Sequence, residues 1–291
     1  MQTVGIVSPG AMGSALGVAL MRGGARTVAT VADRSERTRR LAARAELELL
    51  ESLDEVVAES NVVLSIVPPG EARAVAGDIG RAAAATGARP LLVELNAIAP
   101  KTARAIVRDA ELEVVDGSVS GPPPWRAGAT RVYLSGARAA EVATLPFQGV
   151  RTIVVGEEIG AASAVKMSTA PVYKGTSALL AQALLAAREN GVLEYVLDDL
   201  AAAWPEPVAN VAQRLASAAS KSDRYVAEMR EIAATQASAG LTPRLFEAVA
   251  EVFEALAETE VARRAPEDVG DIGLDDLLEG MTSERRPHVR Q

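Results

Sequence analysis

Few side chains in this sequence can transfer a proton near neutral pH. The chain contains no cysteine, and its one histidine, His288, lies in a polar segment near the C-terminal end. Cysteine nucleophiles, thiolate zinc sites and disulfides are therefore excluded, and neither a Ser-His-Asp triad nor a histidine-ligated metal is expected. Any general acid or base must then be Lys, Tyr, Asp or Glu. Lys166 is the leading candidate, because the residues around it at 161–168, early in a predicted helix, are otherwise Ala, Val, Ser and Met. The alternative is a lysine that reaches from the helix to solvent.

The first turn of the chain has the residue types that bind phosphate. An apolar segment at 3–8 predicts a strand, the following residues are small, and residues 11–22 have a helical pattern. In such a turn the free N–H groups and the positive end of the helix dipole face a pyrophosphate, and glycine lets the backbone approach it. Ser8 stands where the G-x-G-x-x-G motif begins. We nevertheless predict a dinucleotide site here, because the turn opens a βαβ series. Its cofactor-binding residues would be Pro9, Gly10, Ala11, Met12 and Gly13.

The end of the second predicted strand should contact the adenosine ribose. Asp33 would bind a 2′-hydroxyl, as in proteins that use NAD. Arg34 and Ser35 would instead hold a 2′-phosphate, as in proteins that use NADP. We favour NADP(H) over NAD(H). A third interpretation is that Ser35 only caps the next helix.

The predicted secondary structure changes along the chain, from mixed α/β to entirely helical. Up to residue 156, short apolar runs alternate with helical patterns, which predicts βαβ units and a doubly wound parallel sheet of the Rossmann type. The strands are expected at 3–8, 27–32, 62–67, 91–95, 113–116, 131–135 and 152–155, and the helices between them at 11–22, 36–45, 53–58, 71–85 and 101–109.

After residue 156 the pattern is entirely helical. A long Ala/Leu-rich helix is expected at 160–189, with an irregularity at Pro171. Further helices are expected at 192–203, 208–219, 222–239, 243–263 and 275–280. The domains predicted are a nucleotide-binding domain at 1–156, an all-α domain for substrate binding and dimerisation at 157–265, and a tail at 266–291.

Charge and hydrophobic composition indicate which kinds of partner the protein could bind. The formal net charge of −8 argues against nucleic acid, because phosphate backbones need clustered Lys and Arg. No apolar run is long enough to cross a membrane, and the N-terminal residues read as a strand rather than a signal peptide, so a cytoplasmic location is expected. The Ala-rich helices of the all-α domain have too much apolar surface to bury alone. We therefore expect a homodimer through these helices.

Five segments, in order, resemble the motifs of the β-hydroxyacid dehydrogenase family, which is related to 6-phosphogluconate and 3-hydroxyisobutyrate dehydrogenases. The segments are the cofactor turn at 9–13, the apolar run ending in two prolines at 63–69, E-L-N-A-I-A-P at 94–100, D-G-S-V-S-G at 116–121, and G-x-x-x-x-x-K at 160–166. Residues 222–233 are similar to a bacterial subgroup that carries a C-terminal helical domain of unknown function.

The resemblance implies an NAD(P)-dependent oxidoreductase that transfers a hydride between the nicotinamide and a small β-hydroxy acid or its oxo form. Lys166 would be the general acid/base. Ser118, Ser120 and Gly121 would bind the substrate carboxylate, and Val67 and Pro68 would contact the nicotinamide ribose.

Each of three further residues has two alternative roles. Asn96 would orient the nicotinamide or substrate, or it would cap the helix that begins near Pro100. Trp125 would line the pocket or only cover it. Lys174 would be structural or would contact a substrate anion.

One position departs from the family. Ala170 stands where the family usually has Asn, four residues after the lysine. Thr169 and Tyr173 share the helix face of Lys166 and would supply the missing hydrogen bond to substrate.

Two other functions compete with the leading one. Proteins of similar architecture reduce C=N bonds with NADPH, and Tyr173 keeps this imine reductase alternative open, although such enzymes generally have Asp or Tyr in place of the lysine. A non-catalytic dinucleotide sensor is the third alternative. The retained Lys166 and the intact Ser-x-Ser-Gly loop argue against a sensor.

Overall fold

The computed structural model describes residues 2–126, 128–264 and 272–282, so His288 and most of the predicted tail lie outside the described residues. The chain divides into two compact units, the first ending at Met167 and the second beginning at Ser168. The boundary expected near residue 156 marks the end of the last strand, whereas the units divide inside a helix.

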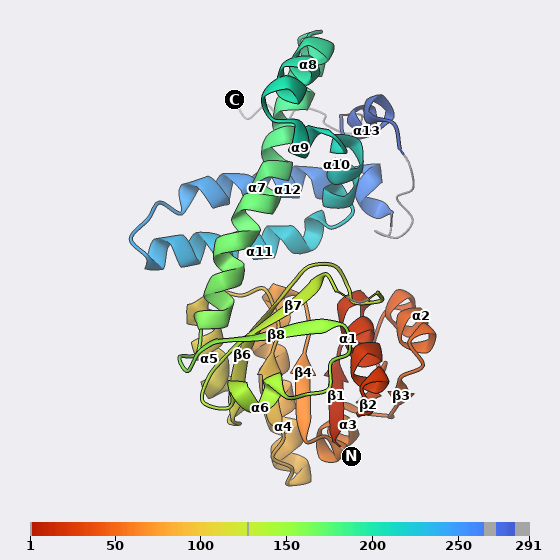
Figure 1. Ribbon diagram of the computed structural model, residues 1–291, viewed down its shortest axis with the longest axis vertical. Coiled ribbons are helices and arrows are strands. Elements are labelled where there is room, and N and C mark those ends of the chain that lie inside the picture. Colours follow the sequence, from red (N-terminus) through yellow and green to blue (C-terminus); the bar gives the residue numbers. More distant parts are fainter. Residues whose placement is uncertain (1, 127, 265–271, 283–291) are drawn as a thin grey trace. The chain divides into compact units, whose positions relative to one another are not determined.

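The first unit is built on one sheet of eight strands among the described residues, in the order β3-β2-β1-β4-β5-β6-β7-β8 (Figure 1). All neighbouring pairs are parallel except β6 and β7. The first six strands follow the Rossmann order, which confirms the predicted fold class. The strands are β1 Thr3–Val7, β2 Arg26–Ala29, β3 Glu48–Leu49, β4 Val62–Ser65, β5 Leu91–Glu94, β6 Val114–Ser120, β7 Thr130–Ser135 and β8 Val150–Gly156.

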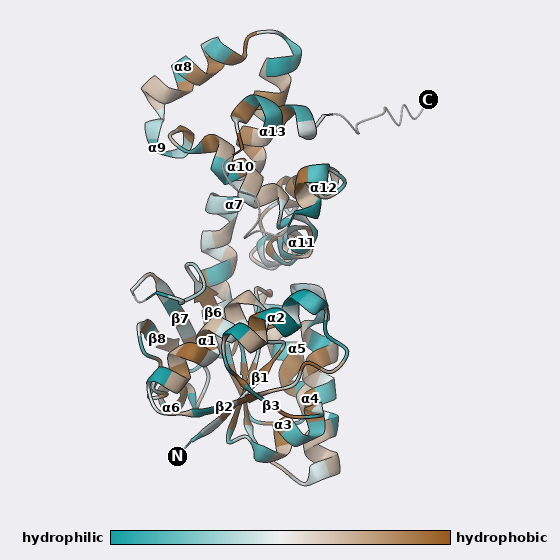
Figure 2. Ribbon diagram, turned by 90° about the vertical axis from the view of Figure 1, so that its right-hand side faces the viewer, coloured by the Kyte–Doolittle hydropathy of each residue, from teal (hydrophilic) through white to brown (hydrophobic). Residues whose placement is uncertain are grey.

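Helices cover both faces of this sheet because the central strands are apolar on both sides. In β4, Val62 and Leu64 belong to one buried cluster, and Val63, which points the other way, belongs to a second. The first cluster includes residues of α1 (Ala11–Arg22), α2 (Glu36–Arg44) and α6 (Ala139–Ala143). The second includes residues of α3 (Leu53–Glu59), α4 (Ala72–Thr86) and α5 (Pro100–Ala110). In Figure 2 the strands at the middle of the sheet are hydrophobic, whereas α2 on the outside is largely hydrophilic.

The described part of the second unit is helical, as predicted. It contains the rest of α7 (Ala161–Glu189), followed by α8 Leu193–Ala203, α9 Pro205–Val208, α10 Val211–Ala219, α11 Ser222–Ser238, α12 Arg244–Ala257, the 3-10 turn η2 Glu260–Arg263 and α13 Leu274–Gly280. Helices α11 and α12 lie side by side (Figure 1), joined by a turn in which Gly240 has φ 75°. Their buried side chains include Met229, Ile232 and Phe253, each 0% exposed.

Several details differ from the predicted elements. Strand β6 continues to Ser120, because β7 pairs with it antiparallel as far as Arg131. The two-residue strand β3 and the short helices α6 and α9 were not expected. The helix expected at 208–219 begins only at Val211, and the helix expected at 243–263 ends at Ala257, before η2. Helix α7 is assigned as one helix through Pro171, although this residue has no N–H to donate to the carbonyl of Met167.

Among the described residues, no helix is both long enough and apolar enough to span a bilayer.

Candidate functional site

Most of the residues predicted to bind cofactor and substrate gather at one edge of the sheet in the first unit. Strands β1, β4, β5 and β6 are mutually parallel, so their carboxyl ends lie at the same edge. Gly10 follows β1, Val67 follows β4, Asn96 follows β5, and Ser118 and Ser120 lie at the end of β6. This edge, where the strand order reverses between β1 and β4, is where open α/β sheets bind ligands.

The turn after β1 fits a dinucleotide. Gly10 is the N-cap of α1 and makes no side-chain cap hydrogen bond, and the first turn of α1 has no acidic residue. A Cβ added at Gly10 would meet nothing within 4 Å, whereas a Cβ at Gly13 would lie 2.6 Å from the Ser8 carbonyl oxygen. Glycine at 13 is thus required by the protein's own packing. At position 10 it keeps space open in front of the helix N-terminus, as close approach of a pyrophosphate requires.

Ser8 has the backbone conformation that the missing glycine would have. Its φ is 66°, in the left-handed region that glycine adopts without strain. The turn is held by a hydrogen bond from the Gly10 amide to the Ser8 carbonyl at 2.8 Å and from the Ser14 hydroxyl to the Pro9 carbonyl at 2.6 Å. The departure from G-x-G-x-x-G therefore changes the side chain but keeps the turn.

The residues expected near the ribose lie between β2 and α2. Asp33 is exposed and has φ 55°, and the Arg34 amide donates to the Val31 carbonyl at 3.2 Å. The Ser35 hydroxyl accepts a hydrogen bond from the Thr38 amide at 3.3 Å and so caps α2. The capping interpretation of Ser35 therefore holds in this structure, and its contact with a 2′-phosphate stays a prediction.

Asn96 connects β5 to the turn after β4. Its Oδ1 accepts from the Val67 amide at 2.6 Å, and its Nδ2 donates to the Ser65 hydroxyl at 3.3 Å. It does not cap α5, whose N-cap is Ala99 without a side-chain hydrogen bond. Asn96 thus shapes the turn that carries Val67 and Pro68, and its own contact with the cofactor stays a prediction.

Trp125 is partly buried and packs against the hydrophobic cluster on the α1 face of the sheet. The guanidinium of Arg44 lies over its ring, 5.7 Å from the ring centroid. Met12 packs against the same cluster.

A row of buried polar side chains, which the sequence did not reveal, crosses this edge of the sheet. Ser65, Glu94, Asp116 and Ser135 are successive register partners on β4, β5, β6 and β7, and each is 0% exposed. Burial, together with the nearby negative charge of Asp116, raises the pKa of Glu94 to about 8. The sequence signal was a carboxylate within each of two predicted apolar strands, Glu94 in 91–95 and Asp116 in 113–116.

Lys166 lies at one end of this region. Its Nζ donates a hydrogen bond to the Val119 carbonyl at 2.9 Å. The Ser118 hydroxyl is buried and donates to the Ala162 carbonyl at 2.7 Å, so its proton is directed at α7. Ser120 is partly exposed, and Gly121 is exposed with φ 104°. Of the three residues expected to bind a carboxylate, only these last two are accessible at the strand end.

The other predicted substrate residues lie on the part of α7 that belongs to the second unit. Thr169 is partly buried, and Tyr173 is 67% exposed. Lys174 forms an ion pair with Glu228 of α11, and its Nζ lies 4.0 Å from the centroid of the Tyr225 ring. Burial raises the pKa of Tyr225. These contacts support the structural interpretation of Lys174.

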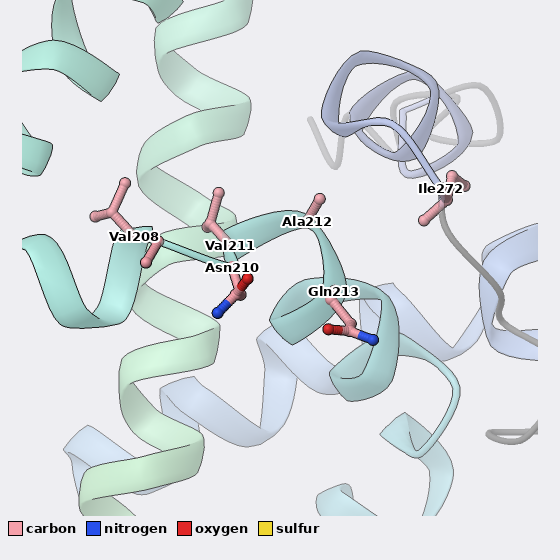
Figure 3. Close-up of a pocket in the computed structure, with 7 residues that line it drawn as sticks. Val208, Asn210, Val211, Ala212, Gln213 and Ile272 are labelled. Carbon is pink, nitrogen blue, oxygen red and sulfur yellow. The ribbon is translucent and has the colours of Figure 1, made fainter.

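A separate hollow of about 320 Å³ lies in the second unit (Figure 3). It is lined by Val208, Ala209, Asn210, Val211, Ala212, Gln213 and Ile272. Its polar side chains are amides, which neither donate nor accept a proton near neutral pH. The hollow is therefore not a candidate for acid–base chemistry.

Comparison with known proteins agrees with both halves of the chain. Residues 3–146 match the model of the NAD binding domain of 6-phosphogluconate dehydrogenase, and residues 187–256 match a domain of unknown function, DUF1932. A curated relative, an uncharacterised 28.5 kDa protein from Methanothermus fervidus, is 26% identical over 171 residues. That match covers 58% of this chain and 65% of the relative, slightly less than two thirds of its length.

Solved structures share the fold over nearly the whole chain. A conserved protein of unknown function, described as structurally similar to 3-hydroxyacid dehydrogenases, is 29% identical with a TM-score of 0.63, covering 90% of this chain and 98% of its own. The 3-hydroxyisobutyrate dehydrogenase of Mycobacterium tuberculosis, solved with L-serine, is 20% identical with a TM-score of 0.63. An imine reductase of Streptomyces aurantiacus is 21% identical with a TM-score of 0.56. Each of these two covers 92% of this chain and 98% of its own, and at this identity they show the fold alone.

The nucleotide-binding turn, the Rossmann strand order and the two matched domains lead to one conclusion. Residues 3–146 belong to the family of NAD binding domains of 6-phosphogluconate dehydrogenase, and residues 187–256 belong to the DUF1932 family.

Proposed function

We propose that the protein transfers a hydride between a nicotinamide cofactor and a small β-hydroxy acid, or the corresponding oxo acid, with Lys166 as the general acid/base. The observation that carries the proposal is the position of Lys166, whose Nζ is held 2.9 Å from the Val119 carbonyl at the carboxyl end of β6. In one direction the neutral amine accepts the proton of the substrate hydroxyl, and in the other the ammonium donates a proton to the carbonyl oxygen.

The cofactor would be held by the first unit and would supply or accept the hydride. The first turn of α1, from Gly10 to Gly13, would face its pyrophosphate, and the turn of Val67 and Pro68 would lie along its ribose. Support comes from the open space at Gly10 and from the contact of Asn96 with the Val67 amide.

The substrate carboxylate would be bound by Ser120 and the backbone at Gly121, both accessible at the end of β6. Thr169 and Tyr173, three and seven residues after Lys166 on α7, would orient the substrate. The solved structure at 29% identity, which is described as structurally similar to 3-hydroxyacid dehydrogenases, supports this substrate class. The class is tested by following NADPH and NADH turnover across a panel of β-hydroxy acids and oxo acids. No turnover of any panel member above the rate without enzyme would contradict it.

NADP(H) is the proposed cofactor. Arg34 stands on the turn after β2, where a 2′-phosphate would lie, and exposed Arg39 and Arg40 follow on α2. Titration with NADPH and NADH tests this preference. Arg34→Ala should weaken NADPH binding by about tenfold, as the loss of a charge-assisted hydrogen bond predicts, and leave NADH binding unchanged. Equal weakening for both cofactors, or tighter binding of NADH by the unchanged protein, would contradict the preference.

Imine reduction is the second candidate, and the exposure of Tyr173 favours it, because its hydroxyl is available as a second proton donor on the Lys166 face of α7. Cyclic imines added to the same panel decide between the two. Faster NADPH oxidation with an imine than with any oxo acid, abolished by Tyr173→Phe and retained in Lys166→Ala, would replace the leading proposal.

A non-catalytic sensor is the remaining alternative, and it predicts tight cofactor binding with no turnover on any panel member. A cytoplasmic location stays a prediction. A homodimer through the helices of the second unit is supported by exposed apolar side chains on α7, including Val172 and Leu179.

A further inference from the structure

Asp116 receives four hydrogen bonds from β7 and from the start of α7. The Ser135 hydroxyl donates to it at 2.9 Å, the Gly160 and Ser163 amides each donate at 3.0 Å, and the Ser163 hydroxyl donates at 2.5 Å. Asp116 and Ser163 are both 0% exposed. The carboxylate therefore satisfies N–H groups at the N-terminus of α7 that the helix itself leaves without partners.

Ala162 is held by two further bonds in the same region. Its amide donates to the Ser135 hydroxyl at 3.0 Å, and its carbonyl accepts from the Ser118 hydroxyl at 2.7 Å. Lys166 follows Ala162 by four residues and so lies on the same face of α7, one turn further along. The bonds that hold the first turn of α7 therefore also set the direction in which Lys166 leaves the helix.

All four groups that contact Asp116 donate hydrogen bonds to its carboxyl oxygens. Its neighbour in the row is Glu94, whose carboxyl is also fully buried. Burial raises the pKa of Glu94 to about 8, and the charge of Asp116 contributes to the rise.

We propose that Asp116, together with Ser135 and Ser163, is the positioning group of Lys166. Its carboxylate holds the first turn of α7 against β6 and β7, so that the Lys166 Nζ stays beside Val119 at the strand end. The proposal rests on the proposed function, because positioning matters for turnover only if Lys166 transfers the proton.

Two variants and one control test the positioning role in the full-length protein. Asp116→Asn replaces an acceptor oxygen by a donor, and Ser163→Ala removes one bond while keeping a good helix-forming residue. Asp109→Asn makes the same substitution as the first variant at an exposed ion pair with Arg73, outside the site. The measured quantities are kcat and KM for the best substrate of the panel, and the dissociation constant for NADPH.

Asp116→Asn should lower kcat on the order of 100-fold, since a displacement of about 1 Å can have this effect on a catalytic group. Ser163→Ala should lower kcat by roughly tenfold, and in both variants KM and NADPH affinity should change by less than about threefold. The Asp109→Asn control should match the unchanged protein. Unchanged kcat in folded Ser163→Ala and Asp116→Asn would overturn the proposal, and so would an equal loss of kcat and NADPH affinity.

A second measurement separates this proposal from the proposed function. Acylation of lysines by an amine-reactive ester, read by mass spectrometry, reports on the surroundings of Lys166 without any turnover. Labelling of Lys166 should rise several-fold in Ser163→Ala and Asp116→Asn, while labelling of exposed Lys101 stays the same. Unchanged labelling of Lys166 would reject the positioning role even if turnover falls. Changed labelling, with full turnover in Lys166→Ala, would uphold positioning and reject Lys166 as the acid/base.

Discussion

At the scale of single residues, Glu94 couples stability to pH. Its pKa is 4.5 in the unfolded chain and about 8 in the folded protein, because burial and the charge of Asp116 favour the neutral form. The folded state therefore binds the proton more tightly. This stabilisation is fully present below about pH 4.5 and is lost as pH rises to about 8.

Glu94→Gln should remove this dependence, because the amide imitates the neutral acid. Between these pH values the free energy of unfolding of the unchanged protein should fall relative to the variant, by up to about 1.4 kcal/mol per pH unit. Urea unfolding of both proteins at several pH values measures the difference. Parallel pH profiles would show that Glu94 is ionised in the folded state.

The two glycines of the first turn should respond differently to the same change. Gly10→Ala adds a Cβ that meets no protein atom within 4 Å, so the melting temperature should not change. Because that Cβ occupies the proposed pyrophosphate space, NADPH affinity should fall at least about tenfold, or roughly 1.4 kcal/mol.

Gly13→Ala is the matched variant. Its Cβ would lie 2.6 Å from the Ser8 carbonyl oxygen, so it should lower the melting temperature. Differential scanning fluorimetry and NADPH titration of both variants check the pair. Unchanged NADPH affinity in Gly10→Ala would place the cofactor elsewhere.

At the scale of elements, the ion pair of Lys174 and Glu228 joins α7 to α11 in the second unit. The side chains are 16% and 6% exposed, so each charge would be costly to leave unpaired. Lys174→Met should destabilise the protein by about 3 kcal/mol. The double variant Lys174→Met, Glu228→Leu should recover most of that loss, because it leaves no buried charge.

Chemical unfolding of the two single variants and the double variant measures this coupling. NADPH binding at low denaturant is the control, since the pair lies outside the first unit. Additive losses in the double variant would show that the pair contributes no coupling energy.

Element prediction succeeded where hydrophobic patterns were long and failed where tertiary contacts decided the structure. The alternation of apolar strands and helices indicated the sheet, its Rossmann class and the all-helical second part. Strand β6 was expected to stop at Asp116, because Gly117, Ser118 and Ser120 are typical of loops. Its extension depends on pairing with β7, a contact that no local pattern contains.

Only part of the candidate site could be predicted, because local sequence patterns indicate motifs but not the contacts between strands. Motif spacing indicated Gly10, Gly13 and Lys166. The roles of Asp116 and Ser135 depend on the register that places them side by side on β6 and β7, which the sequence does not display. A carboxylate inside an apolar strand was the available signal, and it marked a buried polar group without naming its partners.

At the scale of the whole molecule, exposed apolar side chains on α7 support assembly into a dimer. Val172 is 65% exposed and Leu179 is 63% exposed, seven residues apart on one helix face. Leu179→Asp should convert a dimer into a monomer, because burying an unpaired charge in an interface is costly. Light scattering at micromolar concentration measures the mass.

Ala43→Asp adds the same charge at an exposed position of α2 and serves as the control, which should remain dimeric. A monomeric unchanged protein, or a dimeric Leu179→Asp variant, would contradict an interface at this face.

The function of the molecule as a whole depends on proton transfer by Lys166. The most direct test is the single-turnover rate of NADPH oxidation with the best oxo acid of the panel, compared between the unchanged protein and Lys166→Ala. Loss of a general acid predicts a rate about 100- to 10,000-fold lower, with NADPH affinity unchanged. A Lys166→Ala rate equal to that of the unchanged protein would contradict the account.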